Sequence, residues 1–108
     1  MKNTNVRRNR RVTTRAMAEK WAAQIAHRYF GICGGTDFNY TCCSAHTSGD
    51  VLYSFSTPIA AYGNGRFIYN ADKYSRTTSK LQTYVRNAIG ATGIPVDVAD
   101  ESAVRNAI

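Results

Sequence analysis

Residues 74–80, Tyr-Ser-Arg-Thr-Thr-Ser-Lys, gather hydroxyl groups and two cations where a helix is expected to begin. The first amide groups of a helix lack partners within it and carry partial positive charge, so they favour phosphate and other anions. The predicted chemistry is anion binding by Tyr74, Ser75, Arg76, Thr77 and Thr78. Helix capping by Ser75 or Thr77 explains the same pattern without a ligand, so both interpretations remain open.

Positive charge is concentrated in residues 1–12, which contain five cations and almost no apolar side chain. We expect these residues to form a disordered basic arm outside the fold. Cations displace counterions from phosphates, so such an arm adds salt-sensitive affinity for nucleic acid without reading its sequence. A solubilising tail without a partner is the alternative. The residues predicted to bind nucleic acid or a partner are Arg7, Arg8, Arg10, Arg11, Arg15, Arg76 and Lys80.

Cys33, Cys42, Cys43 and His46 are the residues best suited to hold a metal or to act as nucleophile and base. Structural zinc sites usually have paired ligands at short spacing, such as two Cys-x-x-Cys units, which this set lacks. Adjacent cysteines bridge poorly to each other, and no acidic residue is evident that would orient a histidine base. We therefore expect reduced thiols, no metal or other cofactor, and no catalytic residues.

Chain length and composition limit the architecture. With 108 residues there is room for one modest core, so residues 13–108 are expected to form a single domain. A hydrophobic fraction of 44% argues against disorder throughout, and a net charge of +7 favours polyanionic partners. No apolar run approaches the length of a membrane span, so no membrane partner is predicted and the expected location is the cytoplasm.

Hydrophobic spacing predicts two main helices, over about residues 14–30 and 75–90. Strand patterns cover residues 38–43, 51–62 and 66–70, and a Gly-Asn-Gly turn joins the last two as a hairpin. Beyond them, a short extended segment precedes a short C-terminal helix. The predicted fold is therefore α+β, with a small antiparallel three-stranded sheet in the order helix-strand-strand-strand-helix and a short C-terminal helix.

Aromatic residues on the predicted hairpin have two interpretations. Tyr53, Phe55, Phe67 and Tyr69 can form an exposed sheet surface on which bases stack. A small sheet covered by helices also needs aromatic side chains for its own core. We expect most of these rings to pack in the core and a minority to be exposed.

The hairpin and the second helix start together resemble a known type of small domain. Residues 54–60 have the form Ser-aromatic-x-Thr-x-Ile-Ala, and residues 74–78 the form Tyr-Ser-x-Thr-Thr. This pair, within residues 51–86, resembles a small domain of uncharacterised phage and mobile-element proteins. The resemblance implies a phage or mobile-element product acting in the cytoplasm of a bacterial host. An anti-defence protein similar to anti-CRISPR inhibitors is one class that this origin implies.

These observations favour a non-enzymatic accessory protein that binds nucleic acid or a host ribonucleoprotein or defence complex. One alternative is a sponge for a phosphorylated or cyclic nucleotide signal, held by the helix start at residues 74–78. A small structural interaction domain is another. Pro58 places an edge or a bulge in its strand, and a hairpin edge there is compatible with strand pairing in a homo-oligomer.

Overall fold

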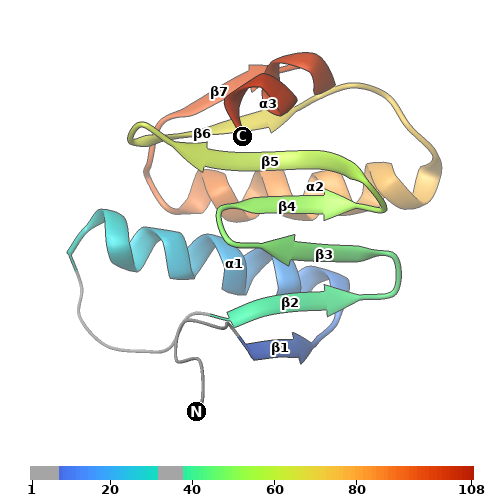
Figure 1. Cartoon of the computed structure of the whole chain (residues 1–108), viewed down its shortest axis with the longest axis horizontal. Coiled ribbons are helices and arrows are strands. Elements are labelled where there is room, and N and C mark those ends of the chain that lie inside the picture. The colour runs from blue at the N-terminus through green and yellow to red at the C-terminus, as the bar shows by residue number, and fades with distance from the viewer. Residues whose placement is uncertain (1–7, 32–37) are drawn as a thin grey trace, which may run out of the picture.

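The computed structural model describes residues 8–31 and 38–108. The strands are β1 (Arg8–Arg11), β2 (Phe38–Cys42), β3 (Ala45–Ser48), β4 (Val51–Ser54), β5 (Thr57–Gly63), β6 (Arg66–Asn70) and β7 (Val96–Ala99). The helices are α1 (Thr14–Tyr29), α2 (Arg76–Ala91) and α3 (Glu101–Ala107). The strands form one mixed sheet in which spatial order follows chain order (Figure 1).

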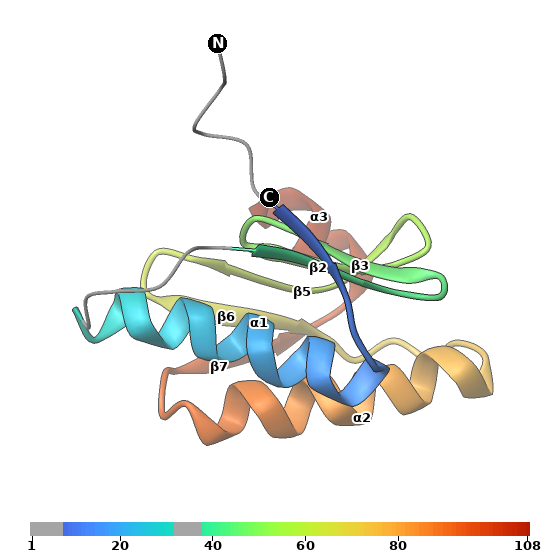
Figure 2. The ribbon, with the colours of Figure 1, turned by 90° about the horizontal axis from the view of Figure 1, so that it is seen from below.

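Two strand-helix-strand crossovers form the ends of this sheet. β1 pairs with β2 in parallel through α1, and β6 pairs with β7 in parallel through α2. The strands from β2 to β6 are antiparallel neighbours, so β6 points in the same direction as β1. Both crossovers step the same way across the sheet, and their shared handedness places both helices on one face (Figure 2). The two helices consequently begin at the same end of the molecule.

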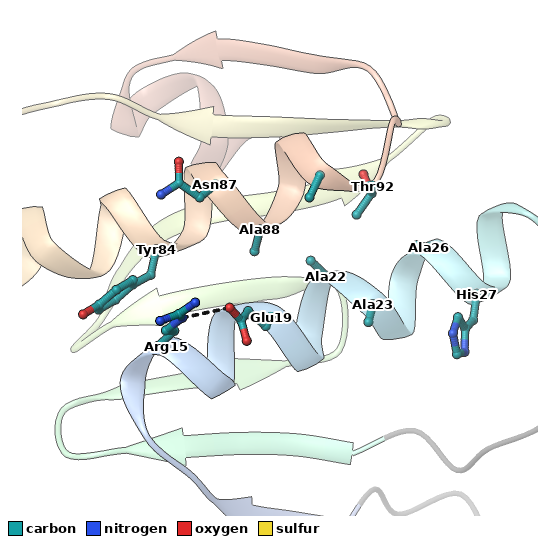
Figure 3. A pocket seen from close by; sticks show the side chains of 11 residues that line it. Arg15, Glu19, Ala22, Ala23, Ala26, His27, Tyr84, Asn87, Ala88 and Thr92 are labelled. Carbon is teal, nitrogen blue, oxygen red and sulfur yellow. Dashed lines mark hydrogen bonds and ion pairs between the residues drawn. The ribbon is translucent and has the colours of Figure 1, made fainter.

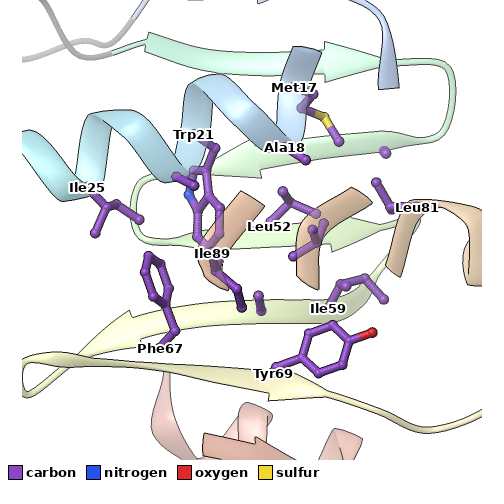
Figure 4. Close-up of a cluster of buried hydrophobic side chains, with 14 of the residues drawn as sticks. Met17, Ala18, Trp21, Ile25, Leu52, Ile59, Phe67, Tyr69, Leu81 and Ile89 are labelled. Carbon is purple, nitrogen blue, oxygen red and sulfur yellow. The ribbon is translucent and has the colours of Figure 1, made fainter. Parts of the chain in front are cut away.

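The main core lies between the sheet and the pair α1 and α2 (Figure 4). The Trp21 ring of α1 lies against Phe67 of β6, with ring centroids 5.6 Å apart. Its indole nitrogen donates a hydrogen bond to the Gly49 carbonyl at 3.1 Å, which satisfies the one polar atom of this buried side chain. From α2, Leu81, Val85 and Ile89 are buried at helical spacing against the same face.

The opposite face of the sheet is covered in part. Helix α3 packs on β5 and β6 and buries Val104 against Val51 and Ala61. Figure 2 shows α3 on the side of the sheet away from α1 and α2. Among the described residues, no helix covers this face over β1, β2 and β3.

The predicted antiparallel three-stranded sheet is wrong, because the sheet has seven strands and its two outer pairs are parallel. Residues 51–62 alternate like one strand, yet the chain reverses at Phe55 and Ser56 and divides them into β4 and β5. Phe55 adopts a φ of 56°, a conformation that favours glycine or asparagine, so the residue types at this reversal do not signal a turn. β1, β3 and β7 have four residues each, which is too short for a clear alternating pattern.

Other elements lie where the spacing predicts them. The three helices and the hairpin of β5 and β6 are confirmed. At the hairpin turn, Asn64 and Gly65 have φ values of 54° and 78°, as a two-residue type I′ turn requires. β1 consists of residues 8–11, which belong to the predicted basic arm of residues 1–12; residues 1–7 lie outside the described residues.

Candidate anion and nucleic-acid site

The first turns of α1 and α2 lie at one end of the molecule, beside the turn between β2 and β3. At α1, the Thr13 hydroxyl accepts a hydrogen bond from the Ala16 amide at 3.2 Å. At α2, the Ser75 hydroxyl accepts from the Thr78 amide at 3.4 Å. Neither first turn contains an acidic residue, so the partial positive charges of both helix ends stay uncompensated by a carboxylate in those turns.

A pocket of about 520 Å³ opens between these two helix starts. Three cations line it: Arg15 from α1, and Arg76 and Lys80 from α2. No Asp or Glu is among its described lining residues. Arg15 forms an exposed ion pair with Glu19 at 3.0 Å, whereas no ion pair within residues 8–31 and 38–108 involves Arg76 or Lys80. The pocket is therefore a positively charged concavity.

Short polar side chains form the rest of the pocket wall. The Thr14 hydroxyl lies 3.1 Å from the Cys42 sulfur, and the buried Ser54 hydroxyl lies 3.2 Å from that of Thr78. Cys43 is exposed in the turn after β2 and, like Cys42, is a free thiol. These groups can donate hydrogen bonds to an anion at the pocket surface without adding negative charge.

The residues predicted to form the anion site divide into two groups. Arg76 and Thr77 line the pocket, with Ser75 as the helix cap beside them. Thr78 is buried and reaches Ser54. Tyr74 instead turns to α3, where its hydroxyl donates to Glu101 at 2.8 Å.

The Tyr74 hydroxyl belongs to a network that attaches α3. It accepts a hydrogen bond from the buried Asn70 amide at 2.9 Å, and burial raises the pKa of Tyr74. The hydrogen bond from Arg105 lowers the pKa of Glu101, with a further contribution from Tyr74. The hydroxyl of Tyr74, predicted to bind an anion, is thus used in hydrogen bonds within the fold.

Part of the predicted basic arm forms strand β1. Arg7 lies outside the described residues, and Arg8 begins β1. The Arg10 guanidinium lies over the Phe38 ring, 4.9 Å from its centroid. Arg11 is exposed at the end of β1, close in the chain to the Thr13 cap. β1 therefore runs toward the end of the molecule where the pocket lies.

The residues best suited by type to hold a metal are Cys33, Cys42, Cys43 and His46. Cys33 lies outside the described residues. His46 is on β3, where its ring stacks on Tyr53 with centroids 5.0 Å apart and an interplanar angle of 14°. Among the residues that the structure describes, no group of three His, Cys, Asp or Glu side chains is placed to hold a metal ion.

The hairpin aromatics also separate by face. Phe67 and Tyr69 are buried in the main core, which is half of the four rings rather than most of them. Tyr53 is half-buried on the opposite face, and Phe55 is 68% exposed at the turn between β4 and β5. Sequence reasoning missed the pairing of His46 with Tyr53, because β3 carries no strand signal that would set its register.

A second groove of about 790 Å³ runs between α1 and α2 (Figure 3). Five alanines are among its lining residues, including Ala22, Ala26 and Ala88. Arg15 and Tyr84 line both this groove and the cationic pocket, so the two adjoin. Alanine offers no hydrogen-bonding group, and the ion pair of Arg15 with Glu19 stands at the end nearest the pocket. The groove is therefore the less suited of the two to anion binding.

Within the described part of the chain, no helix is long and apolar enough to cross a membrane. No match was found among curated proteins or among solved structures. A family model described as a family of unknown function, DUF8033, matches residues 3–97, which include both helix starts and the cationic pocket. The chain belongs to this DUF8033 family.

Proposed function

We propose that the protein binds nucleic acid through the cationic pocket, either free nucleic acid or that of a host ribonucleoprotein. The observation that carries this proposal is the convergence of two helix N-termini with Arg15, Arg76 and Lys80, without an acidic lining residue. Helix ends and guanidinium groups both favour phosphate, and their fields add over a few ångströms. A net charge of +7 strengthens the attraction at longer range.

The proposal is for binding without catalysis. The described pocket contains thiols and hydroxyls, but no His, Asp or Glu lines it to serve as a general base. The Ser-aromatic-x-Thr and Tyr-Ser-x-Thr-Thr motifs favour a phage or mobile-element origin. In that setting the protein acts in the bacterial cytoplasm on a nucleic-acid-handling complex, as an anti-defence inhibitor.

The test compares a variant that lacks two cations of the pocket with a control variant that lacks two cations elsewhere on the surface. The variant Arg76→Gln with Lys80→Gln acts on the pocket; the control Lys20→Gln with Arg86→Gln changes exposed residues that line neither pocket. Fluorescence anisotropy with a labelled oligonucleotide measures the affinity. We expect at least about a tenfold loss for the pocket variant, since each charge-assisted contact is worth about 1.5–3 kcal/mol. We expect less than about a threefold loss of affinity for the control, because its two substitutions remove only long-range electrostatic attraction, which salt screens.

Salt dependence provides a second measure of the same contacts. Each phosphate neutralised contributes about −0.7 to −0.9 to the slope of log affinity against log salt. The pocket variant should therefore have a slope smaller in magnitude by about 1.5 than the wild type. Equal affinities and slopes for the pocket variant and the control would contradict the proposed site, because binding would then depend on the net charge of the protein and not on the position of the cations.

A nucleotide sponge is the second candidate, and the volume of the pocket favours it. A concavity of about 520 Å³ is within the range of small-ligand sites. Calorimetry with a cyclic mononucleotide separates the candidates, because a sponge gives saturable binding of the mononucleotide alone. A nucleic-acid binder needs several linked phosphates and gives weak binding in that assay.

A further inference from the structure

The face of the sheet that faces away from α1 and α2 carries a row of side chains across four strands. Strand register aligns Arg11 with Thr41, Thr41 with His46, and His46 with Tyr53. Their chain neighbours Tyr40, Ala45 and Leu52 are buried in the core on the helix-covered face. Because side chains alternate along a strand, the four aligned residues share the other face.

The distance between Arg11 and His46 in this row suits a nucleobase stacked between them. His46 and Tyr53 already stack on each other, so their rings stand up from the sheet. Arg11 and His46 are two strands apart, about 9.6 Å at the backbone, with only Thr41 between them. This backbone separation exceeds twice the about 3.4 Å spacing of stacked bases, as a base placed between the imidazole ring and the guanidinium requires. Both groups stack on bases irrespective of sequence.

Charge on this face is compatible with a polyanion. From β1 to β4, the described residues that share the face with this row include no Asp or Glu. Arg11 lies at one side of the row. At the other side, the Arg105 guanidinium donates to the Ser56 carbonyl at 3.2 Å beside the turn between β4 and β5, and it also pairs with Glu101 at 2.7 Å. A phosphate on the Arg11 side of a stacked base therefore meets a cation.

Phe55 connects this face to the cationic pocket. It lies between Ser54, which lines the pocket, and Ser56, and its amide donates to Ser44 of the pocket wall at 2.8 Å. The ring is 68% exposed, and the backbone has a φ of 56°. Exposure and a left-handed backbone are both unfavourable for phenylalanine, so a structural role alone does not explain the residue. An exposed aromatic ring at this place is suited to stack on a base.

We propose that the ligand is single-stranded nucleic acid, which runs from the cationic pocket over Phe55 onto the row of His46 and Tyr53. This inference rests on the proposed function and names its substrate class. Bases of a single strand can turn outward and stack on protein rings, whereas those of a duplex are already stacked in pairs. The pocket supplies phosphate contacts, and the sheet face supplies stacking.

The experiment compares three probes of about 15 nucleotides, near the upper site size of single-strand binders. They are oligo(dT), oligo(U) and a DNA duplex of mixed sequence. We expect both single strands to bind at least about tenfold more tightly than the duplex, and the ratio of the two distinguishes DNA from RNA. Phe55→Asn and His46→Ala should each weaken single-strand binding about tenfold and leave duplex binding unchanged.

Phe30→Asn is the matched control, because Phe30 is also a strongly exposed phenylalanine but follows α1 at the opposite end of that helix. Thermal unfolding of each variant shows that it is folded. Equal binding of duplex and single strands, with no effect of Phe55→Asn or His46→Ala, would overturn the inference. If Arg76→Gln with Lys80→Gln still weakened binding, the proposed function would stand. Absence of binding to all three probes would refute both.

Discussion

Phe55 offers a test in which stability and binding should move in opposite directions. The residue occupies a left-handed conformation, with a φ of 56°, in the two-residue turn between β4 and β5. This conformation costs an ordinary L-residue about 1–2 kcal/mol, and asparagine tolerates it better. Replacing Phe55 by Asn should therefore recover most of that free energy of folding.

The packing that this substitution removes is small. Full burial of a phenylalanine is worth about 1.5–3 kcal/mol, and a ring that is 68% exposed gains only about a third of it, or about 0.5–1 kcal/mol. The net expectation for Phe55→Asn is a stability gain of about 0.5–1 kcal/mol, which raises Tm by about 2–5 °C. Phe55→Ala loses the packing and keeps the unfavourable backbone, so it should lower stability by about 0.5–1 kcal/mol.

Urea and thermal denaturation of the two variants, followed by circular dichroism, check this order. The expected ranking of stability is Asn above wild type above Ala at position 55. If both variants were destabilised equally, contacts of the ring would dominate, and the argument from backbone strain would be refuted. If the Asn variant were more stable and also bound oligonucleotides more weakly, the cost carried by Phe55 would be linked to binding.

Three further predictions concern the fold around the site. Asn70→Ala should lower stability by about 2–3 kcal/mol in urea denaturation, because it removes buried hydrogen bonds to Pro58 and Tyr74. Deleting residues 1–11 should lower Tm relative to deleting residues 1–7, because only the longer deletion removes the pairing of β1 with β2. The pKa of Glu101 is lowered, so the stabilisation that its carboxylate provides is present above the ordinary pKa of 4.5 and is lost as pH falls through the pKa of the folded protein. In thermal melts at a series of pH values, Glu101→Gln should lack this loss of stability at acid pH.

Each of these has a clear contrary result. An Asn70→Ala variant of unchanged stability would mean that its hydrogen bonds contribute nothing net. Equal melting temperatures for the two deletions would show that β1 adds no stability. The same pH dependence in wild type and Glu101→Gln would assign the acid-dependent loss to other carboxylates.

The helices could be predicted because their signals are local. In α2, Ser75 caps the first turn, and Leu81, Val85 and Ile89 recur on one face within a single segment. The hairpin of β5 and β6 is equally local, since Asn64 and Gly65 specify its turn. Such elements depend on neighbours within a few residues.

The strands that were missed depend on distant partners. β1 has almost no apolar side chain and becomes a strand only by pairing with β2, across the whole of α1. The four residues of β3 are held between β2 and β4, and the register, not the local sequence, brings His46 onto Tyr53. Strand pairing supplies the hydrogen bonds that such short segments cannot provide alone.

The candidate site was predicted in separate parts. The sequence by itself determined which side chains carry charge, where both helices start, and that Arg76 and Lys80 lie near a helix N-terminus. Only the tertiary structure decided that the start of α1, with Arg15, lies beside them. The physical reason is the equal handedness of two parallel crossovers at opposite ends of one sheet, a property of chain topology that no local pattern of residues encodes.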